Sequence, residues 1–219
     1  MTDRCDLLVV AAFAPELAGF DGLLGSAGAA EVCGLRVVAW PVGIGIVAAA
    51  SGTAARLELG CPRAVVLVGT CGAYAGSGLS IGDVVMARAS LLVEPAVLEG
   101  RAAHPDPMPT RLRTHAALTT AMATAGARVV DIATTLAMTT DDDLATRLSA
   151  HAAVEHLEAF AVASACASKA VPFCAVLGVA NAVGSRGRAE WRAHHDPAGR
   201  AAAAYVTRWI QSGARGLEP

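Results

Sequence analysis

The stretch AVVLVGTCGAYAGSGLSIGDVVMA, residues 64–87, decides the fold. It opens with an apolar run, Ala64–Val68, which is typical of a strand buried on both faces of a sheet. A turn of glycine, threonine and cysteine is expected next, and after a loop at Gly76–Gly78 a second strand is predicted over Asp83–Ala89. A buried strand that ends in glycines is a common ligand site in open α/β sheets, because glycine lets a ligand approach the backbone closely.

Strands and helices alternate through the rest of the chain. Further strands are predicted over residues 6–12, 31–40 (one strand or a pair), 127–135 and 171–179, and helices over 16–24, 46–59, 114–125, 158–169 and 196–211. No linker or repeat interrupts this order. The pattern predicts one α/β domain, residues 1–219, with a central mixed, twisted sheet flanked by helices.

Helix starts and one loop are predicted from local signals. Thr140, followed by Asp143 three residues later, is a candidate N-cap, and Asp196-Pro197 is a candidate N-cap and first-position pair. Residues 94–109 contain four prolines and little periodicity. We expect them to form a loop that covers the active site.

Composition excludes several classes of partner. The 219 residues are 54% hydrophobic, with a formal net charge of -2 and no lysine or arginine block, which argues against nucleic acid. No apolar run reaches the roughly 18 residues of a membrane span. The N-terminus MTDRCDLLVV lacks the basic region and cleavage site of a signal peptide, so we expect a cytoplasmic protein. None of the six cysteines forms a C-x-x-C pair that would indicate zinc or redox chemistry.

Five separated segments carry a family resemblance. They are VVAAFAPEL (9–17), VGIGIVAAA (42–50), VGTCGAYAGSGLSIGDVV (68–85), VEHLEAFAVA (154–163) and LGVANAVGSRGRAEW (177–191). In their order and spelling the chain resembles the nucleoside phosphorylase and nucleosidase superfamily, in the branch that contains methylthioadenosine nucleosidase and futalosine hydrolase. The phrases around residues 74–85, 154–158 and 181–191 are most similar to futalosine hydrolase. The resemblance implies cleavage of a purine nucleoside, no metal or organic cofactor, and a homo-oligomer of two or more subunits.

The resemblance assigns the catalytic roles to Glu16 and Asn181. Glu16 in APEL matches the family's water-activating glutamate; the alternative is a glutamate that only favours a helix start. Many relatives that cleave adenine nucleosides carry aspartate at the position of Asn181. An amide offers a donor to O6 of a 6-oxopurine and an acceptor to its protonated N7, so asparagine favours hypoxanthine or guanine as leaving group. The alternative is a turn asparagine after a strand.

Substrate-binding roles are implied for a second set of residues. Glu158, preceded by Leu157, matches the family's ribose-binding Met-Glu motif, and a carboxylate can accept from two vicinal hydroxyls. Glu155 is expected to be solvated or to cap a helix. Thr70, Cys71 and Gly72 would face the ribose or the nucleophile, unless they form only a strand-ending turn.

The segment after Asn181 suggests how a 5′ substituent is held. Arg186 or Arg188 would bind the carboxylate of futalosine while Trp191 packs on its ring; the alternative is a solvated basic loop with a packed tryptophan. Leu67 stands where phosphorylases of the superfamily use an arginine for phosphate, which favours hydrolysis. The rival hypotheses are a purine nucleoside phosphorylase, a methylthioadenosine or adenosylhomocysteine nucleosidase, and a non-catalytic nucleoside sensor.

Overall fold

A computed structural model describes residues 4–123 and 126–217. Expectations for residues 1–3, and for Thr124 and Ala125 at the end of a predicted helix, lie outside these ranges. The elements are, in chain order, β1 (Leu7–Ala11), the 3₁₀ helix η1 (Ala14–Phe20), α1 (Asp21–Leu24), β2 (Ala29–Val32), β3 (Leu35–Pro41), α2 (Ile46–Gly60), β4 (Ala64–Ala73), β5 (Val84–Leu92), α3 (Pro95–Leu98), β6 (Arg111–Arg113), α4 (Ala116–Ala123), β7 (Arg128–Thr134), α5 (Asp142–Leu148), β8 (Val154–Glu155), α6 (Ala159–Ser168), β9 (Phe173–Ala182) and α7 (Gly187–Gln211).

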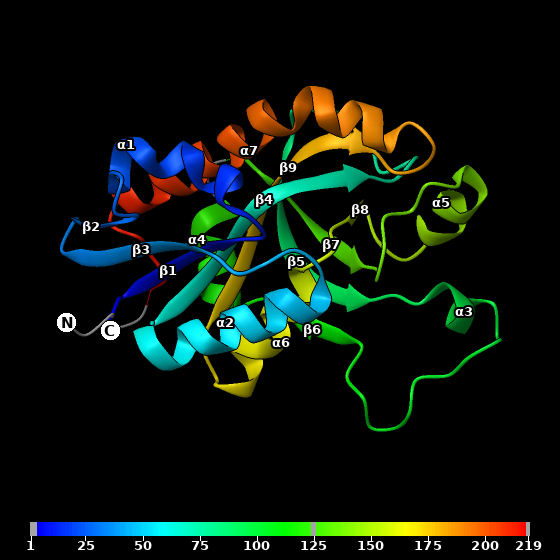
Figure 1. Ribbon diagram of the computed structural model, residues 1–219, viewed down its shortest axis with the longest axis horizontal. Coiled ribbons are helices and arrows are strands. Elements are labelled where there is room, and N and C mark those ends of the chain that lie inside the picture. The colour runs from blue at the N-terminus through cyan, green and yellow to red at the C-terminus, as the bar shows by residue number, and fades with distance from the viewer. Residues whose placement is uncertain (1–3, 124–125, 218–219) are drawn as a thin grey trace.

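The strands of the described residues form one mixed, nine-stranded sheet. Its order is β2-β3-β1-β4-β8-β7-β5-β6, and β9 pairs with both β4 and β5. β1, β4 and β9 run parallel, whereas β9 and β5 are antiparallel. Helix α7 lies with η1 and α1 on one face of the sheet, and α2 and α6 cover the other (Figure 1). The expected α/β domain with a mixed sheet flanked by helices is confirmed.

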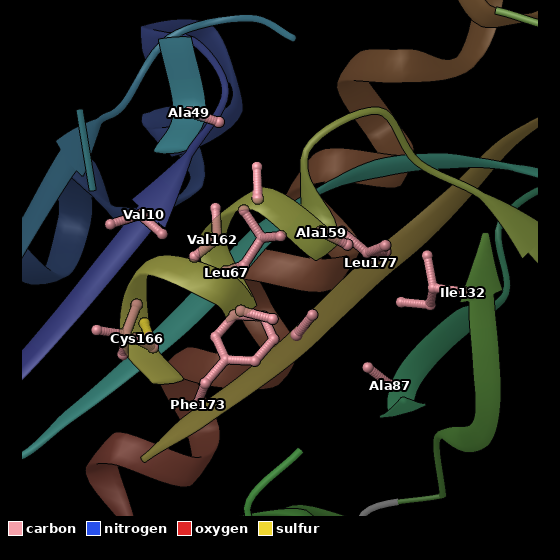
Figure 2. Packing of buried hydrophobic residues seen from close by; sticks show 14 of the residues in the cluster. Val10, Ala49, Leu67, Ala87, Ile132, Ala159, Val162, Cys166, Phe173 and Leu177 are labelled. Carbon is pink, nitrogen blue, oxygen red and sulfur yellow. The ribbon is translucent and has the colours of Figure 1, made fainter. Parts of the chain in front are cut away.

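The core is divided between the two faces of the sheet. All ten residues of β4 are buried, as expected for a strand covered on both sides. On the α2/α6 face, Val10 and Leu67 belong to one cluster with Val162 and Cys166 of α6 (Figure 2). On the other face α7 packs so closely on β9 that a Cβ at Gly178 would lie 2.1 Å from the Ala198 carbonyl oxygen.

Strand β4 is longer than predicted, and the expected turn at Gly69–Gly72 is wrong. These residues continue the strand to Ala73 because β9 pairs with them along their whole length and β8 pairs with Gly72 and Ala73. The glycines therefore do not end the strand. They let other side chains lie directly against it.

Several further predictions are corrected. Asp141, not Thr140, caps α5, because its Oδ1 accepts the Leu144 N–H at 2.7 Å. Helix α7 begins at Gly187, and Pro197 lies within it on the exposed side, where the Ala193 carbonyl that loses its N–H partner can bond to water. The residues 31–40 form a pair of antiparallel strands, β2 and β3. Strands β6 and β8 were not predicted.

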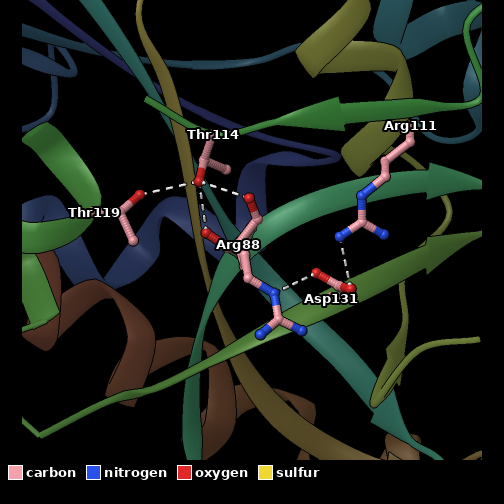
Figure 3. A network of polar contacts seen from close by, with 6 residues as sticks. Arg88, Arg111, Thr114, Thr119 and Asp131 are labelled. Carbon is pink, nitrogen blue, oxygen red and sulfur yellow. Dashed lines mark hydrogen bonds and ion pairs between the residues drawn. The ribbon is translucent and has the colours of Figure 1, made fainter. Parts of the chain in front are cut away.

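The edge formed by β5, β6 and β7 is held by charged side chains. Asp131 accepts from Nε of Arg88 and from the guanidinium of Arg111, each at 2.9 Å (Figure 3). Residues 94–109 form a long irregular connection apart from the short α3, and none of them lines the cavity described below. The expectation that they cover the active site is therefore wrong for the described structure. No helix in the residues 4–123 and 126–217 combines the length and apolarity that a membrane span requires.

Candidate active site

A cavity of about 410 Å³ lies where β1, β4, β8 and β9 end. It is of a size that suits a small organic ligand. It brings together Glu16, Thr70, Cys71, Gly72, Leu157, Glu158, Asn181 and Arg188, all of them predicted as site residues from the sequence. Residues on or after β1, β4 and β9 converge because parallel strands present their carboxyl ends at one edge of a sheet. Leu157 and Glu158 reach the same edge because β8 pairs antiparallel with the last residues of β4.

The Glu16 carboxylate is buried beside Thr70 at the floor of the cavity. Pro15 is the second residue of η1, and Glu16 follows it in the first turn. Glu16 is only 8% exposed. Oε1 accepts both the backbone N–H of Thr70 (3.0 Å) and its hydroxyl (3.1 Å). Oε2 has no partner of hydrogen-bonding geometry among the described residues.

Burial raises the pKa of Glu16 to about 7, against the lowering effect of the Thr70 hydrogen bonds. The negative charge of Glu158 raises the pKa further, and the Ala12 backbone N–H lowers it, as the smallest of these contributions. A carboxylate that is half ionised near neutral pH is suited to general-base catalysis. A glutamate that only favoured a helix start would need neither this burial nor the two hydrogen bonds from Thr70.

Glu158 occupies the N-cap position of α6, makes no side-chain capping bond there, and is 5% exposed. Oε1 accepts the backbone N–H of Gly45 at 2.7 Å, which ties the start of α2 to the cavity wall. His156 Nδ1 accepts the Glu158 backbone N–H (3.2 Å) and lies 3.4 Å from Oε2. Burial lowers the pKa of His156, although Glu158 opposes the shift. His156 is thus neutral, with its proton on Nε2, and it leaves Oε2 of Glu158 free to accept from a ligand.

Asn181 is placed by a β-bulge rather than by a turn. In the β4–β9 ladder Cys71 pairs with Val179 but Gly72 pairs with Asn181, so Ala180 is the extra residue. A bulge changes the direction in which the next side chain points. Nδ2 of Asn181 donates to its neighbour's carbonyl, Ala182 O, at 2.7 Å, which leaves its second proton and Oδ1 for other partners. A Cβ at Gly72 would lie 2.8 Å from that Nδ2.

Cys71 lines the cavity as a buried thiol. Burial, and to a smaller extent Glu16, raises the pKa of Cys71 far above its usual range. A protonated thiol is a poor nucleophile. Leu157 lines the same wall beside Glu158.

The arginines after Asn181 separate into two environments. Arg188 lines the cavity, together with Arg192 one turn further along α7. Arg186 does not: its side chain is 76% exposed and pairs with Glu190 at 3.4 Å. The role predicted for Arg186 is therefore wrong for this conformation. Trp191 lines the cavity and donates from Nε1 to Thr70 Oγ1 at 3.0 Å.

Sequence reasoning missed the role of Glu155. It is 8% exposed, not solvated, and Oε2 accepts from the hydroxyls of Tyr74 (2.8 Å) and Thr139 (2.6 Å). Oε1 accepts the Thr139 N–H at 2.9 Å, so Glu155 anchors the segment that carries Met138 into the cavity wall. His156 was missed as well. The polar residues clustered in VEHLE could have indicated that Glu155 and His156 belong to the site. Local sequence does not reveal their partners, because Tyr74 and Thr139 are distant in the chain.

A second cavity, of about 380 Å³, lies between α6 and the residues 112–116. It contains no carboxylate, so it lacks the groups that glycosidic cleavage needs. Among the described residues, no three His, Cys, Asp or Glu side chains are grouped as metal ligands would be.

Solved structures with a similar fold include nucleosidases. 5′-Methylthioadenosine/S-adenosylhomocysteine nucleosidase from Neisseria meningitidis, in complex with methylthio-immucillin-A, superposes with a TM-score of 0.82 and 22% identity over 94% of this chain and 98% of that one. The same enzyme from Colwellia psychrerythraea, with adenine, gives 0.84 and 21% over 97% of both chains. Futalosine hydrolase of Helicobacter pylori gives 0.82 and 14% over 94% and 97%.

At these identities the likeness establishes the fold. No curated protein sequence matches the chain. The sequence model of the phosphorylase superfamily matches residues 12–211, a range that contains every residue of the candidate active site. The chain therefore belongs to the phosphorylase superfamily.

Proposed function

We propose that this protein hydrolyses the N-glycosidic bond of a 6-oxopurine nucleoside, with futalosine as the preferred substrate. The observation that carries the proposal is that Glu16, Glu158 and Asn181, far apart in the sequence, line one cavity. They supply a base for water, an acceptor for ribose hydroxyls and an amide for the leaving purine.

Glu16 is proposed as the general base. Oε1 is engaged by Thr70, whereas Oε2 keeps its lone pairs for a water proton. As the water oxygen forms a bond to C1′, the bond from C1′ to the purine breaks, and Glu16 takes one proton from the water. The purine takes a proton from solvent at N7 as it leaves, and Oδ1 of Asn181 accepts a hydrogen bond from that N7–H; the proton held by Glu16 then returns to solvent and restores the base. Catalysis depends on stabilising the charge that develops on ribose and purine in this step.

Hydrolysis is favoured over phosphorolysis by the electrostatics around Glu16. Burial, Thr70, Glu158 and Ala12 shift the pKa of Glu16, and none of these is a cation. A phosphate dianion beside Glu16 and Glu158 would be repelled by both carboxylates, and of the residues lining the cavity only Arg188 and Arg192 could offset its charge. Leu67 is less informative than expected, because its side chain is fully buried in the core and does not reach the cavity.

Arg188 supports a substrate with a carboxylate on its 5′ side, and Arg192 offers a second cation on the same helix. Neither side chain makes a hydrogen bond or ion pair with another of the described residues. If futalosine is the substrate, the enzyme belongs to menaquinone biosynthesis and acts in the cytoplasm.

Purine release from futalosine, aminofutalosine, inosine and methylthioadenosine, each with and without phosphate, tests the proposal. We expect phosphate-independent release of hypoxanthine, fastest from futalosine. Faster release of adenine would indicate a methylthioadenosine nucleosidase, and a requirement for phosphate would indicate a phosphorylase. Binding without turnover on any of the four would indicate a sensor. Glu16→Gln is expected to lower kcat by about 10²–10⁴-fold while binding persists.

We also propose that the protein is a homo-oligomer. Ile44 and Met138 line the cavity although they are 65% and 53% exposed, and Val47 and Leu136 near them in sequence are 79% and 74% exposed. Exposed apolar side chains of this kind favour a second copy of the chain as partner. Light scattering after gel filtration measures the mass; a monomer at micromolar concentration would contradict the proposal.

A further inference from the structure

The indole of Trp191 reaches from α7 to the end of the cavity where Glu16 lies. Nε1 of Trp191 is 3.0 Å from Oγ1 of Thr70, although the residues are 121 positions apart in the sequence. Oγ1 of Thr70 is in turn 3.1 Å from Oε1 of Glu16. A chain of hydrogen bonds thus runs from α7 through β4 to the carboxylate.

Chemistry fixes the direction of these hydrogen bonds. An indole N–H can only donate, so Thr70 Oγ1 accepts from Trp191. A threonine hydroxyl has a single proton, and the acceptor within reach of it among the described residues is Oε1 of Glu16. Trp191 therefore directs the Thr70 proton toward the carboxylate.

Packing holds both ends of this donor chain. The Trp191 ring stacks on His195, with centroids 4.3 Å apart and planes 20° apart. His195 Nδ1 donates to the Trp191 carbonyl at 3.0 Å, since a carbonyl can only accept. A Cβ at Gly199 would lie 3.7 Å from Cγ2 of Thr70, so α7 lies beside the Thr70 methyl group as well as its hydroxyl.

We propose that Trp191 is a positioning residue for the base: its N–H orients the Thr70 hydroxyl, which holds Oε1 of Glu16 and leaves Oε2 to receive the proton. This inference rests on the proposed function, in which Glu16 is the base. It assigns Trp191 a role other than packing on the substrate ring. The donor chain stabilises the ionised carboxylate, so its loss disfavours ionisation.

Other ionisable groups line the same cavity or stack on Trp191, so any test must distinguish their effects from that of Glu16. Those on the neighbouring elements are Cys71 of β4, Glu155 of β8, His156 and Glu158 before α6, and Arg188, Arg192 and His195 of α7. The variants below leave all of them in place.

Proton NMR of the indole groups tests the inference without any turnover. The chain has three tryptophans, so the Trp191 indole signal is assigned by its loss in Trp191→Phe. We expect its chemical shift to follow pH with a midpoint near 7, as Glu16 titrates. This component should vanish in Glu16→Gln and in Thr70→Val. An indole signal whose pH dependence is unchanged in Glu16→Gln overturns the inference.

Kinetics provide the second readout. In Trp191→Phe, which keeps a ring but lacks the N–H, the acid limb of kcat/KM is expected to move up by about 0.5 pH unit, equal to about a 3-fold loss below the limb. Thr70→Val should shift it at least as far, and Trp191→Phe should add nothing in that background. Trp209→Phe is the matched control. Trp209 lies on the same helix as Trp191 but outside the cavity, and the substitution removes its indole N–H bond to the Arg215 carbonyl.

The outcomes separate this inference from the proposed function. A loss in Trp191→Phe that is equal at every pH, or that persists in the Thr70→Val background, overturns the positioning role. Absence of turnover on all nucleosides contradicts the proposed function, while the NMR titration still decides whether Trp191 is coupled to Glu16.

Discussion

The carboxylate of Glu16 lies directly on the backbone of Gly69. A Cβ at residue 69 would be 3.0 Å from Oε1 and 3.1 Å from both Cδ and Oε2, closer than a side-chain carbon normally approaches. The absence of a side chain thus lets the carboxylate reach the N–H of Thr70.

Gly69→Ala is therefore expected to displace Glu16 while the strand persists. A shift of the base by a few tenths of an ångström or more should lower kcat by at least about 10-fold. Steady-state kinetics and circular dichroism check this together. The matched control is Gly76→Ala in the loop after β4, which shares the backbone strain of a positive φ (79° at Gly76, 157° at Gly69) but where a Cβ would meet nothing within 4 Å. Full activity in a folded Gly69→Ala protein would contradict the placement of the base.

Glu16→Gln is expected to stabilise the protein at alkaline pH. The pKa of Glu16 is raised from 4.5 to about 7, so between these values the folded state holds a proton that the unfolded state releases. Stability from this group is therefore fully present below about pH 4.5 and is lost as pH rises through 7. The variant should be more stable by roughly 3 kcal/mol at pH 8 and similar to wild type at pH 4.5.

Urea unfolding at pH 4.5 and pH 8 measures this difference. Glu31→Gln, at an exposed position of β2, is the control that removes a carboxylate outside the cavity. Equal gains in stability at both pH values would show that burial does not hold the Glu16 proton.

Asn181→Asp is expected to reverse the preference for the purine. The Ala182 carbonyl lies 2.7 Å from Nδ2 and requires a donor there, which an ionised carboxylate does not supply. An aspartate must hold a proton or turn away, and its acceptor oxygens match the amino group of adenine. The ratio of kcat/KM for inosine to that for adenosine should fall by about 10²-fold. Asn181→Ala, which removes both functions, should lower both rates without such a reversal.

Arg188→Gln is expected to affect substrates according to their 5′ group. Losing a charge-assisted hydrogen bond should lower kcat/KM for futalosine by about 10-fold and leave inosine, which has no 5′ carboxylate, nearly unchanged. Arg186→Gln is the matched control, because Arg186 points to solvent and pairs with Glu190. Equal losses for both nucleosides in Arg188→Gln would exclude a contact with the 5′ carboxylate.

Local sequence was sufficient for most of the elements. The continuous apolar runs of β4 and of the start of β9 indicate strands that are buried on both faces. The alanine-rich segment of α2 indicates a helix. Predictions from local sequence were wrong where the local signals fit more than one structure. The glycines of residues 69–72 suggested a turn, and Asp196-Pro197 suggested a helix start, but pairing with β9 and packing of α7 on the sheet determined both.

The candidate site shows the same division. The sequence by itself, through its motifs, determined an α/β sheet and pointed to Glu16, Glu158 and Asn181 as candidate site residues, which line one cavity. Only the tertiary structure decided that Arg188 rather than Arg186 faces the cavity, that Glu155 is buried, and that a bulge directs Asn181. The physical reason is that periodicity records which face of an element is apolar, whereas the partners of a buried polar group are fixed by strand register and helix packing between residues far apart in the chain.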